Sequence, residues 1–132
     1  MQNRTDAFSG NLHTILVVED DAVVRALTLE VLEAFGYQVF GAEDGGTALS
    51  ILRGEQALNL LMTDIGLPDI SGLELAEQAL TLRPGIAVLL ASGYDTQEHQ
   101  SVRNMAGNGA VATITKPFQL DQLRSVLQAM LG

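Results

Sequence analysis

The sequence predicts an α/β fold, a doubly wound parallel sheet of five strands, and three observations support this class. Five short apolar segments alternate along the chain with five segments of helical periodicity. Such alternation is typical of a parallel sheet that carries helices on both faces. The first, third and fourth apolar segments are almost continuously hydrophobic, as strands buried on both faces must be. The chain has 132 residues, of which 47% are hydrophobic, and this suffices for one core in one domain.

The strands are predicted from short apolar runs bounded by polar or turn-forming residues. In chain order they span Thr14–Val18, Gln38–Phe40, Leu58–Thr63, Ile86–Ala91 and Ala110–Ile114. The second and fifth are shorter or more polar than the others, which suits the edges of a sheet. This places the first strand beside the third, in the order 2-1-3-4-5 of the flavodoxin-like (βα)5 class. Ligands of such sheets bind at the carboxyl ends of the strands.

The helices follow from apolar residues spaced three or four positions apart. They are predicted at Asp21–Phe35, Thr47–Arg53, Ser71–Leu82, Thr96–Ala106 and Leu120–Leu131. Gly36 suits the C-terminal stop of the first helix. Ser71 is expected to cap the third helix, which ends before Pro84.

Charge and composition argue against several classes of function. The formal net charge of -9 disfavours nucleic-acid binding through this domain, because phosphate contacts require clustered Lys and Arg. The absence of cysteine removes disulfides, thiolate metal sites and cysteine nucleophiles. No run approaches the roughly 18 apolar residues of a membrane span, and Met1–Asn11 lacks the apolar core of a signal peptide. We expect a flexible leader at residues 1–12 and one cytoplasmic domain at residues 13–132, without membrane contact.

Acidic side chains follow two strands that the predicted order places side by side. Glu19, Asp20 and Asp21 come directly after the first strand, and Asp64 follows the third. The carboxyl ends of neighbouring parallel strands meet at one edge, so these acids would repel one another unless a divalent cation lies between them. Mg²⁺ takes oxygen ligands and keeps several waters. We therefore expect a Mg²⁺ site that uses two carboxylates of the first loop, Asp64 and a backbone carbonyl.

Simpler explanations exist for the same acids. An acid at a helix N-terminus stabilises it by roughly 0.3 to 1 kcal/mol, and we assign that role to Asp21 alone, because one acid suffices. Asp64 lies among turn formers, Gly66, Pro68 and Asp69. Turn formation does not explain why an acid ends a buried run opposite an acidic pair. A metal-bound carboxylate is a competent nucleophile toward phosphorus, and this is the chemistry we expect of Asp64.

Two more polar residues follow the other strands. Lys116 comes after the fifth strand, and its ammonium would reach a phosphoryl oxygen from the side opposite the metal; most lysines are only surface groups. Ser92 ends the fourth run and offers a hydroxyl to another oxygen, although a satisfied strand-end serine is the simpler interpretation. The Lys116–Pro117 bond is expected to be cis, because the loop must turn sharply to bring the lysine over the pocket.

These motifs together resemble the receiver domain of bacterial response regulators. They are Ile15–Asp21, Thr63–Pro68, Ala91–Gly93 and Lys116–Phe118, in the order of the family. The resemblance covers about residues 13 to 131 and extends to receivers fused to hybrid histidine kinases. It implies that Asp64 is the phosphoacceptor, Ser92 the switch hydroxyl and Lys116 the phosphate-sensing lysine. The implied metal ligands are Glu19, Asp20, Asp64 and the backbone carbonyl of Gly66.

The chain departs from the family pattern in three places. Thr113 stands on the fifth strand where many receivers carry an aromatic switch residue, so a rotamer change of an aromatic ring cannot report phosphorylation there. Glu19 replaces the commoner aspartate and, being longer, can bind the metal through water. Gly93 gives the loop after Ser92 extra freedom. Tyr94, in the same loop, is expected to shield the acyl phosphate from water.

The resemblance implies phosphorelay signalling by a protein that is not an enzyme beyond its own phosphorylation and dephosphorylation. A histidine kinase or histidine phosphotransfer protein would phosphorylate Asp64. The surface of the fourth helix, fifth strand and fifth helix would then change toward a downstream protein partner. A pseudo-receiver that only docks partners is one alternative. An aspartyl-phosphate phosphohydrolase is another, although such enzymes generally carry a second aspartate where this chain has Gly66. Oligomeric state, and whether the chain is free-standing or part of a hybrid kinase, stay open.

Overall fold

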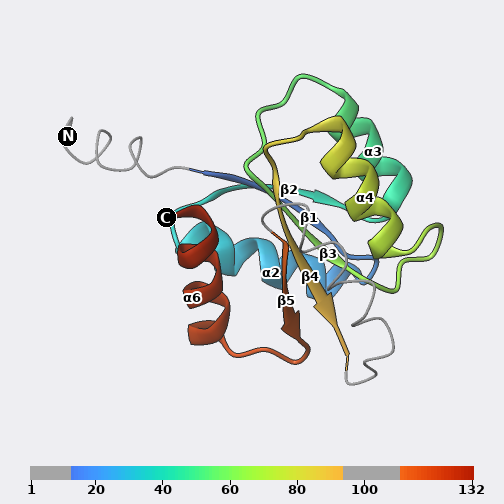
Figure 1. Cartoon of the computed structure of the whole chain (residues 1–132). Helices are drawn as coiled ribbons and strands as arrows, with labels where there is room; N and C mark the ends of the chain where they lie inside the picture. The colour runs from blue at the N-terminus through green and yellow to red at the C-terminus, as the bar shows by residue number, and fades with distance from the viewer. Residues whose placement is uncertain (1–12, 94–110) are drawn as a thin grey trace.

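The computed structural model describes residues 13–93 and 111–132, which form a five-stranded parallel sheet with helices. The strands are β1 (Thr14–Val18), β2 (Gln38–Ala42), β3 (Leu60–Asp64), β4 (Ala87–Ser92) and β5 (Val111–Thr115). Their order is β2-β1-β3-β4-β5, and every neighbouring pair is parallel (Figure 1). The predicted fold class and strand order are therefore confirmed. The strands begin and end within two residues of their predicted bounds.

Four helices lie in the part of the chain that the structure describes. They are α2 (Ala22–Ala34), α3 (Gly45–Arg53), α4 (Gly72–Leu82) and α6 (Leu120–Leu131). The predicted helix at Thr96–Ala106, like Tyr94, lies outside the described residues. No helix formed by residues 13–93 or 111–132 is long and apolar enough to cross a membrane.

Side-chain caps set where the helices begin. Ser71 caps α4 as predicted, because its hydroxyl oxygen accepts a hydrogen bond of 3.1 Å from the amide of Glu74. The prediction that the second helix begins at Thr47 was wrong: α3 begins at Gly45. Asp44 is its N-cap and accepts from the amide of Thr47 at 2.8 Å, so the helix takes in the two glycines before that threonine.

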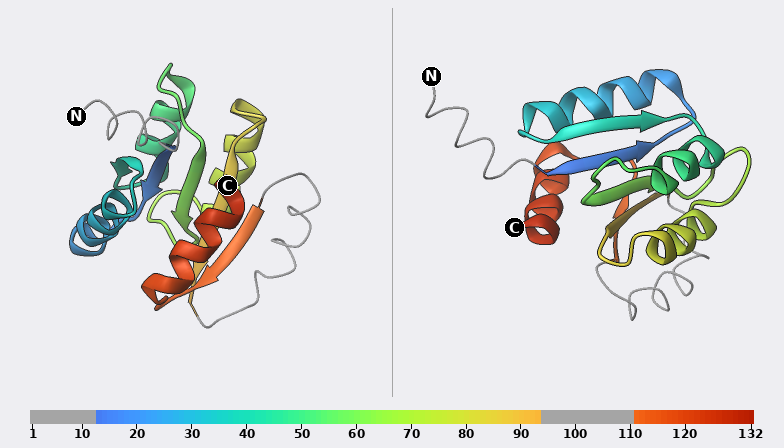
Figure 2. Two further views of the ribbon diagram at one scale, coloured as in Figure 1. Left: turned by 90° about the vertical axis from the view of Figure 1, so that its left-hand side faces the viewer. Right: turned by 90° about the horizontal axis from the view of Figure 1, so that it is seen from above.

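The helices form two layers on opposite faces of the sheet (Figure 2). α2 and α6 cover one face, where Leu32 and Leu127 pack against alternate residues of the central strands. α3 and α4 cover the other face, where Leu52 and Leu75 pack against the intervening strand residues. All four of these leucines are almost completely buried, and each stabilises the fold by roughly 1.5–3 kcal/mol relative to exposure. The two cores fix the central strands between the helix layers, and with them the carboxyl ends of these strands.

Candidate functional site

Two carboxylates meet at the carboxyl edge of the sheet, on its two central strands. Val18 of β1 pairs with Thr63 of β3, so the residues that follow, Glu19 and Asp64, lie opposite each other. Their side chains are only 10% and 18% exposed. Carboxylates so far removed from water destabilise a fold unless a positive charge compensates them. The pair therefore requires a cation.

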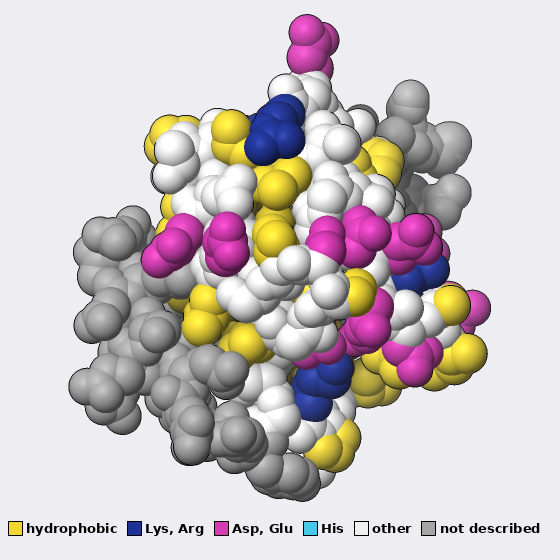
Figure 3. Space-filling view, turned by 90° about the vertical axis from the view of Figure 1, so that its right-hand side faces the viewer, with side chains coloured by type: hydrophobic (Ala, Val, Ile, Leu, Met, Phe, Trp, Pro, Cys, Tyr) yellow, Lys and Arg dark blue, Asp and Glu magenta, His cyan; other side chains and the backbone are white. Residues whose placement is uncertain are grey.

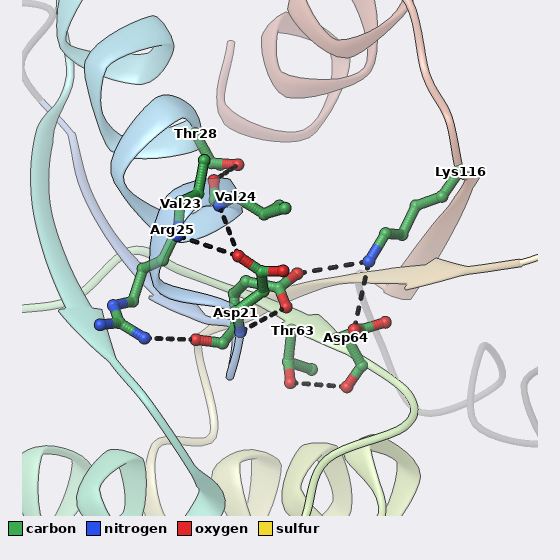
Figure 4. A network of polar contacts seen from close by, with 9 residues as sticks. Asp21, Val23, Val24, Arg25, Thr28, Thr63, Asp64 and Lys116 are labelled. Atoms are coloured by element: carbon green, nitrogen blue, oxygen red, sulfur yellow. Dashed lines mark hydrogen bonds and ion pairs between the residues drawn. The ribbon is translucent and has the colours of Figure 1, made fainter.

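Lys116 supplies a positive charge between these two carboxylates. Its Nζ lies 3.3 Å from Oε1 of Glu19 and 3.2 Å from Oδ2 of Asp64. In Figure 4 the side chains of Lys116 and Asp64 point toward each other. Burial is the largest single influence on the pKa of the Lys116 ammonium and lowers it. The charges and hydrogen bonds of Asp64 and Glu19 together outweigh burial and raise the pKa above its usual value. The ammonium is thus charged at neutral pH and bridges the two acids.

The backbone around Lys116 fixes where its side chain starts. Its amide donates a hydrogen bond of 2.6 Å to the carbonyl of Ser92, which keeps the loop after β5 beside the end of β4. The Lys116–Pro117 peptide bond is cis, as predicted. The end of β4 therefore holds the backbone from which the lysine side chain starts.

The neighbouring acids Asp20 and Asp21 have different surroundings. Oδ1 of Asp21 accepts hydrogen bonds from the amides of Val23 at 2.9 Å and Val24 at 3.1 Å, so this residue caps α2 as predicted. Asp20 is exposed, and one of its oxygens lies within 4.8 Å of oxygens of both Glu19 and Asp64. Three carboxylates so close together match the hard oxygen ligands that Mg²⁺ prefers. The donor set therefore fits a magnesium ion.

The wider surface also favours a cation. Figure 3 shows one side of the molecule on which Asp and Glu side chains are far more prominent than Lys and Arg. This agrees with the formal net charge of -9. A surface with an excess of one charge concentrates ions of the opposite charge around it.

Ser92 and Gly66 lie beside Asp64 in a second opening of the site. Together with Asp64 and the loop after β3 they line an open cavity of about 460 Å³. Ser92 is almost completely buried at the end of β4, the strand beside β3. Thr113 is exposed on β5, opposite Leu90 of β4. Ser92 and Gly66, two of the predicted site residues, therefore line this cavity next to Asp64.

One residue that the sequence analysis did not single out controls the backbone of Asp64. A side-chain carbon built on Gly72, the first residue of α4, would overlap the carbonyl oxygen of Asp64 and come within 2.7 Å of Cα of Ile65. The Gly72 amide also donates a hydrogen bond of 2.7 Å to the carbonyl of Ile65. A glycine next to a cap residue at a helix start was the available signal, because glycine is used where two backbones approach closely.

Arg25 was likewise missed. Its Nη1 donates a hydrogen bond of 2.7 Å to the carbonyl oxygen of Glu19, from the second turn of α2 (Figure 4). Gly41 of β2 lies beside this side chain, since an added carbon there would meet Cδ1 of Leu29 at 3.0 Å and Cδ of Arg25 at 3.4 Å. The guanidinium thus holds the backbone at the end of β1, where the acidic pair begins.

Comparisons with known proteins identify relatives of this chain. A family model described as the response regulator receiver domain matches residues 15–128. The response regulator receiver protein CpdR of Brucella abortus is 31% identical over 117 residues, which are 89% of this chain and 95% of that protein. A solved receiver domain protein (CheY-like) from Methanospirillum hungatei JF-1 has a TM-score of 0.81 and 35% identity, and the match covers 91% of this chain and 94% of that one.

Other relatives are longer than the region they share with this chain. The match spans 49% of the probable transcriptional regulatory protein TcrX of Mycobacterium tuberculosis, at 31% identity over 118 residues. It spans 12% of the sensor kinase CckA of Brucella abortus, at 31% identity over 121 residues. The chain thus covers about half of the first of these proteins and a small part of the second.

Proposed function

Because the chain belongs to the receiver domains of two-component response regulators, we propose that it is a Mg²⁺-dependent phosphoacceptor switch of a phosphorelay. Asp64 accepts the phosphoryl group, and the protein catalyses only its own phosphorylation and dephosphorylation. The observation that carries this proposal is the position of the Asp64 carboxylate, opposite Glu19 and 3.2 Å from the ammonium of Lys116. A cytoplasmic location belongs to the same proposal.

The residues of the site divide into metal ligands and phosphate contacts. In this proposal Glu19, Asp20 and Asp64, whose carboxylate oxygens lie within 4.8 Å of one another, would hold Mg²⁺ together with the backbone carbonyl of Gly66. Bound Mg²⁺ neutralises charge on the phosphoryl oxygens. Lys116 supplies a second positive charge to the oxygens of a phosphoryl group on Asp64, and Ser92 offers them its hydroxyl from the adjoining cavity. The excess of negative charge is then compensated from both sides.

The transfer needs no further catalytic group. A carboxylate oxygen of Asp64 attacks the phosphorus of a phosphohistidine, an O–P bond forms and the N–P bond breaks. The imidazole of the donor leaves and takes a proton from solvent. The product is an acyl phosphate, and positioning with charge neutralisation accounts for most of the catalysis of such transfers.

This chain offers a surface beside the pocket on which a histidine kinase or phosphotransfer protein can dock. A groove of about 540 Å³ runs between α2 and α6 and is lined by Lys116 and by apolar side chains, Leu27 and Leu120 among them. These two leucines are 57% and 55% exposed. Exposed apolar side chains next to a reactive group are typical of a protein interface. We propose that the downstream partner binds the surface of β5, α6 and the helix predicted from the sequence at Thr96–Ala106.

Intact-mass spectrometry tests the proposal. Incubation with acetyl phosphate and Mg²⁺ is expected to add one phosphoryl group, and removal of the metal with EDTA is expected to prevent this. Asp64→Asn should remain unlabelled, whereas Asp44→Asn, the same change at an aspartate outside the site, should be labelled. Labelling of Asp64→Asn at the wild-type level would refute the assignment. Steady turnover of a generic phosphomonoester would indicate a phosphohydrolase instead.

A further inference from the structure

The loop between β3 and α4 carries Gly66, and a second aspartate anchors this loop. Oδ1 of Asp69 accepts hydrogen bonds of 2.9 Å from the amides of Gly45 and Ile70. Its other oxygen, Oδ2, accepts one of 2.8 Å from the amide of Gly46. Both oxygens of this exposed carboxylate are therefore engaged by backbone amides, two of them in a different element, α3.

The partners of Asp69 are amides that the helix itself cannot satisfy. Gly45 and Gly46 are the first two residues of α3, and the first four amides of a helix have no intrahelical acceptor. The N-terminal end of the helix dipole also favours an anion. The hydrogen bonds from Gly45 and Gly46, in that order, are the main reason that the pKa of Asp69 lies below its usual value. The carboxylate is thus charged at neutral pH.

Packing independently shows that the loop is seated on this helix. A side-chain carbon built on Gly45 would come within 2.5 Å of Cγ1 and 2.8 Å of Cδ1 of Ile70, and within 3.2 Å of Oδ1 of Asp69. The glycine therefore leaves the space that Ile70 and Asp69 occupy. Glycine is unfavourable in a helix, so its presence here indicates that close contact with the loop matters more than helix propensity.

The two ends of the loop are held by backbone hydrogen bonds. The Ile65 amide donates to the carbonyl of Ala91 at 3.1 Å, and the Gly72 amide donates to the carbonyl of Ile65 at 2.7 Å. Asp69 adds a side-chain anchor between these points. Gly66 lies between the end fixed at Ile65 and the anchor at Asp69, so the position of its carbonyl depends on both.

We propose that Asp69 is a positioning residue that fixes the Gly66 loop against the N-terminus of α3 and thereby sets the affinity for the divalent cation. It contacts neither the cation nor the phosphoryl group. This inference rests on the proposed function, in which the Gly66 carbonyl is a ligand. Loss of a residue that orients a metal ligand typically weakens binding by about 10-fold or more.

Binding of Mn²⁺, measured from the electron paramagnetic resonance signal of the free ion, tests the inference on the full chain. Asp69→Ala is expected to weaken Mn²⁺ binding about 10-fold. Asp69→Asn is expected to weaken it less, since the amide oxygen still accepts from Gly45 and Ile70. Asp44→Ala is the matched control, because it removes one charge and one cap of the same helix but lies outside the loop. Its affinity should stay within about 2-fold of the wild type.

Hydrogen exchange of residues 66–70 in the metal-free protein separates this inference from the proposed function. Exchange should be faster in Asp69→Ala than in the wild type and unchanged in Asp44→Ala. If Asp69→Ala does not fold, Asp69→Asn is measured in its place. Unchanged exchange in the Asp69 variants, or equal loss of Mn²⁺ affinity in the Asp44 and Asp69 variants, would overturn the inference. A wild type that binds Mn²⁺ but is never phosphorylated would instead refute the proposed function and leave the role of Asp69 standing.

Discussion

Asp64, the last residue of β3, and Asp69, in the loop that follows it, lie five positions apart and show two ways in which a protein holds a carboxylate. Asp69 accepts hydrogen bonds from three backbone amides, two of them at a helix N-terminus. In the described residues 13–93 and 111–132, the Asp64 carboxylate accepts a hydrogen bond from the ammonium of Lys116, which also donates to Glu19. Three amides from two segments hold the Asp69 carboxylate, whereas one lysine side chain, which can change its rotamer, faces Asp64. Asp69 is thus suited to fixing structure and Asp64 to reacting.

The contrast follows from where each residue enters the fold. Asp69 faces unsatisfied donors of α3, which stabilise its charge. Asp64 ends a buried central strand opposite a second acid, where charge is unfavourable until a cation compensates it. The same side chain therefore stabilises one region and provides reactivity in the other.

The largest effect on the Asp64 region is expected from Gly72→Ala. The added carbon would overlap the backbone of Asp64, and relief of such a clash requires backbone shifts that cost about 1–3 kcal/mol or more. Gly66→Ala is the matched control, because its added carbon meets nothing within 4 Å. Urea denaturation should show a large loss of unfolding free energy in the first variant and a change within about 0.5 kcal/mol in the second. Equal losses would contradict the close approach of α4 to Asp64.

A second comparison separates the neighbouring acids Asp20 and Asp21. Asp20→Asn should weaken Mg²⁺ binding by at least about 10-fold, because a carboxylate ligand is lost and even a residue that only orients a ligand contributes that much. Asp21→Ala should leave Mg²⁺ binding nearly unchanged and lower the unfolding free energy by about 1 kcal/mol, because α2 loses its cap. Calorimetric titration and urea denaturation of both variants measure the two quantities. Equal loss of Mg²⁺ affinity would mean that the cation binds elsewhere.

A smaller effect is expected from Lys116→Met. The ammonium competes with a cation for Glu19 and Asp64, so the variant should bind Mg²⁺ a few-fold more tightly. Without metal it should be less stable than the wild type at pH 8. The folded-state pKa of Lys116 is raised, so its stabilising contribution is complete below about 10.5 and is lost as the pH rises through the folded value. The difference in unfolding free energy between the two proteins should therefore shrink as the pH rises above about 10.5. A difference that does not change with pH would contradict the ion pair.

The smallest expected effect is the change in melting temperature caused by Asp69→Asn, which should disappear at acidic pH. The folded-state pKa of Asp69 is lowered, so its contribution is complete above the ordinary value of about 3.8 and is lost as the pH falls through the folded value. Asp69→Asn should therefore melt slightly below the wild type at pH 6 and at the same temperature near pH 2. Calorimetry at both pH values measures this. A difference that persists unchanged at pH 2 would show that the charge of Asp69 does not contribute.

Hydrophobic patterning was enough to predict the strand order, because continuously apolar runs mark central strands and their order fixes which loops meet. Asp64 and Lys116 could be placed together on that basis. Asp69 could be predicted only as a turn former, since its partners Gly45 and Gly46 lie 24 and 23 residues away and are backbone amides without a side-chain signature. Gly72 and Arg25 were missed for the same reason, because each acts on the backbone of another element.

The central claim is that Asp64, and not its neighbour Asp69, takes the phosphoryl group. After incubation with acetyl phosphate and Mg²⁺, borohydride reduction converts an aspartyl phosphate into homoserine, which peptide mass spectrometry can locate. We predict homoserine at position 64 only, and none when Mg²⁺ is omitted. Homoserine at position 69, or at both positions equally, would contradict the distinction between the reactive and the structural carboxylate.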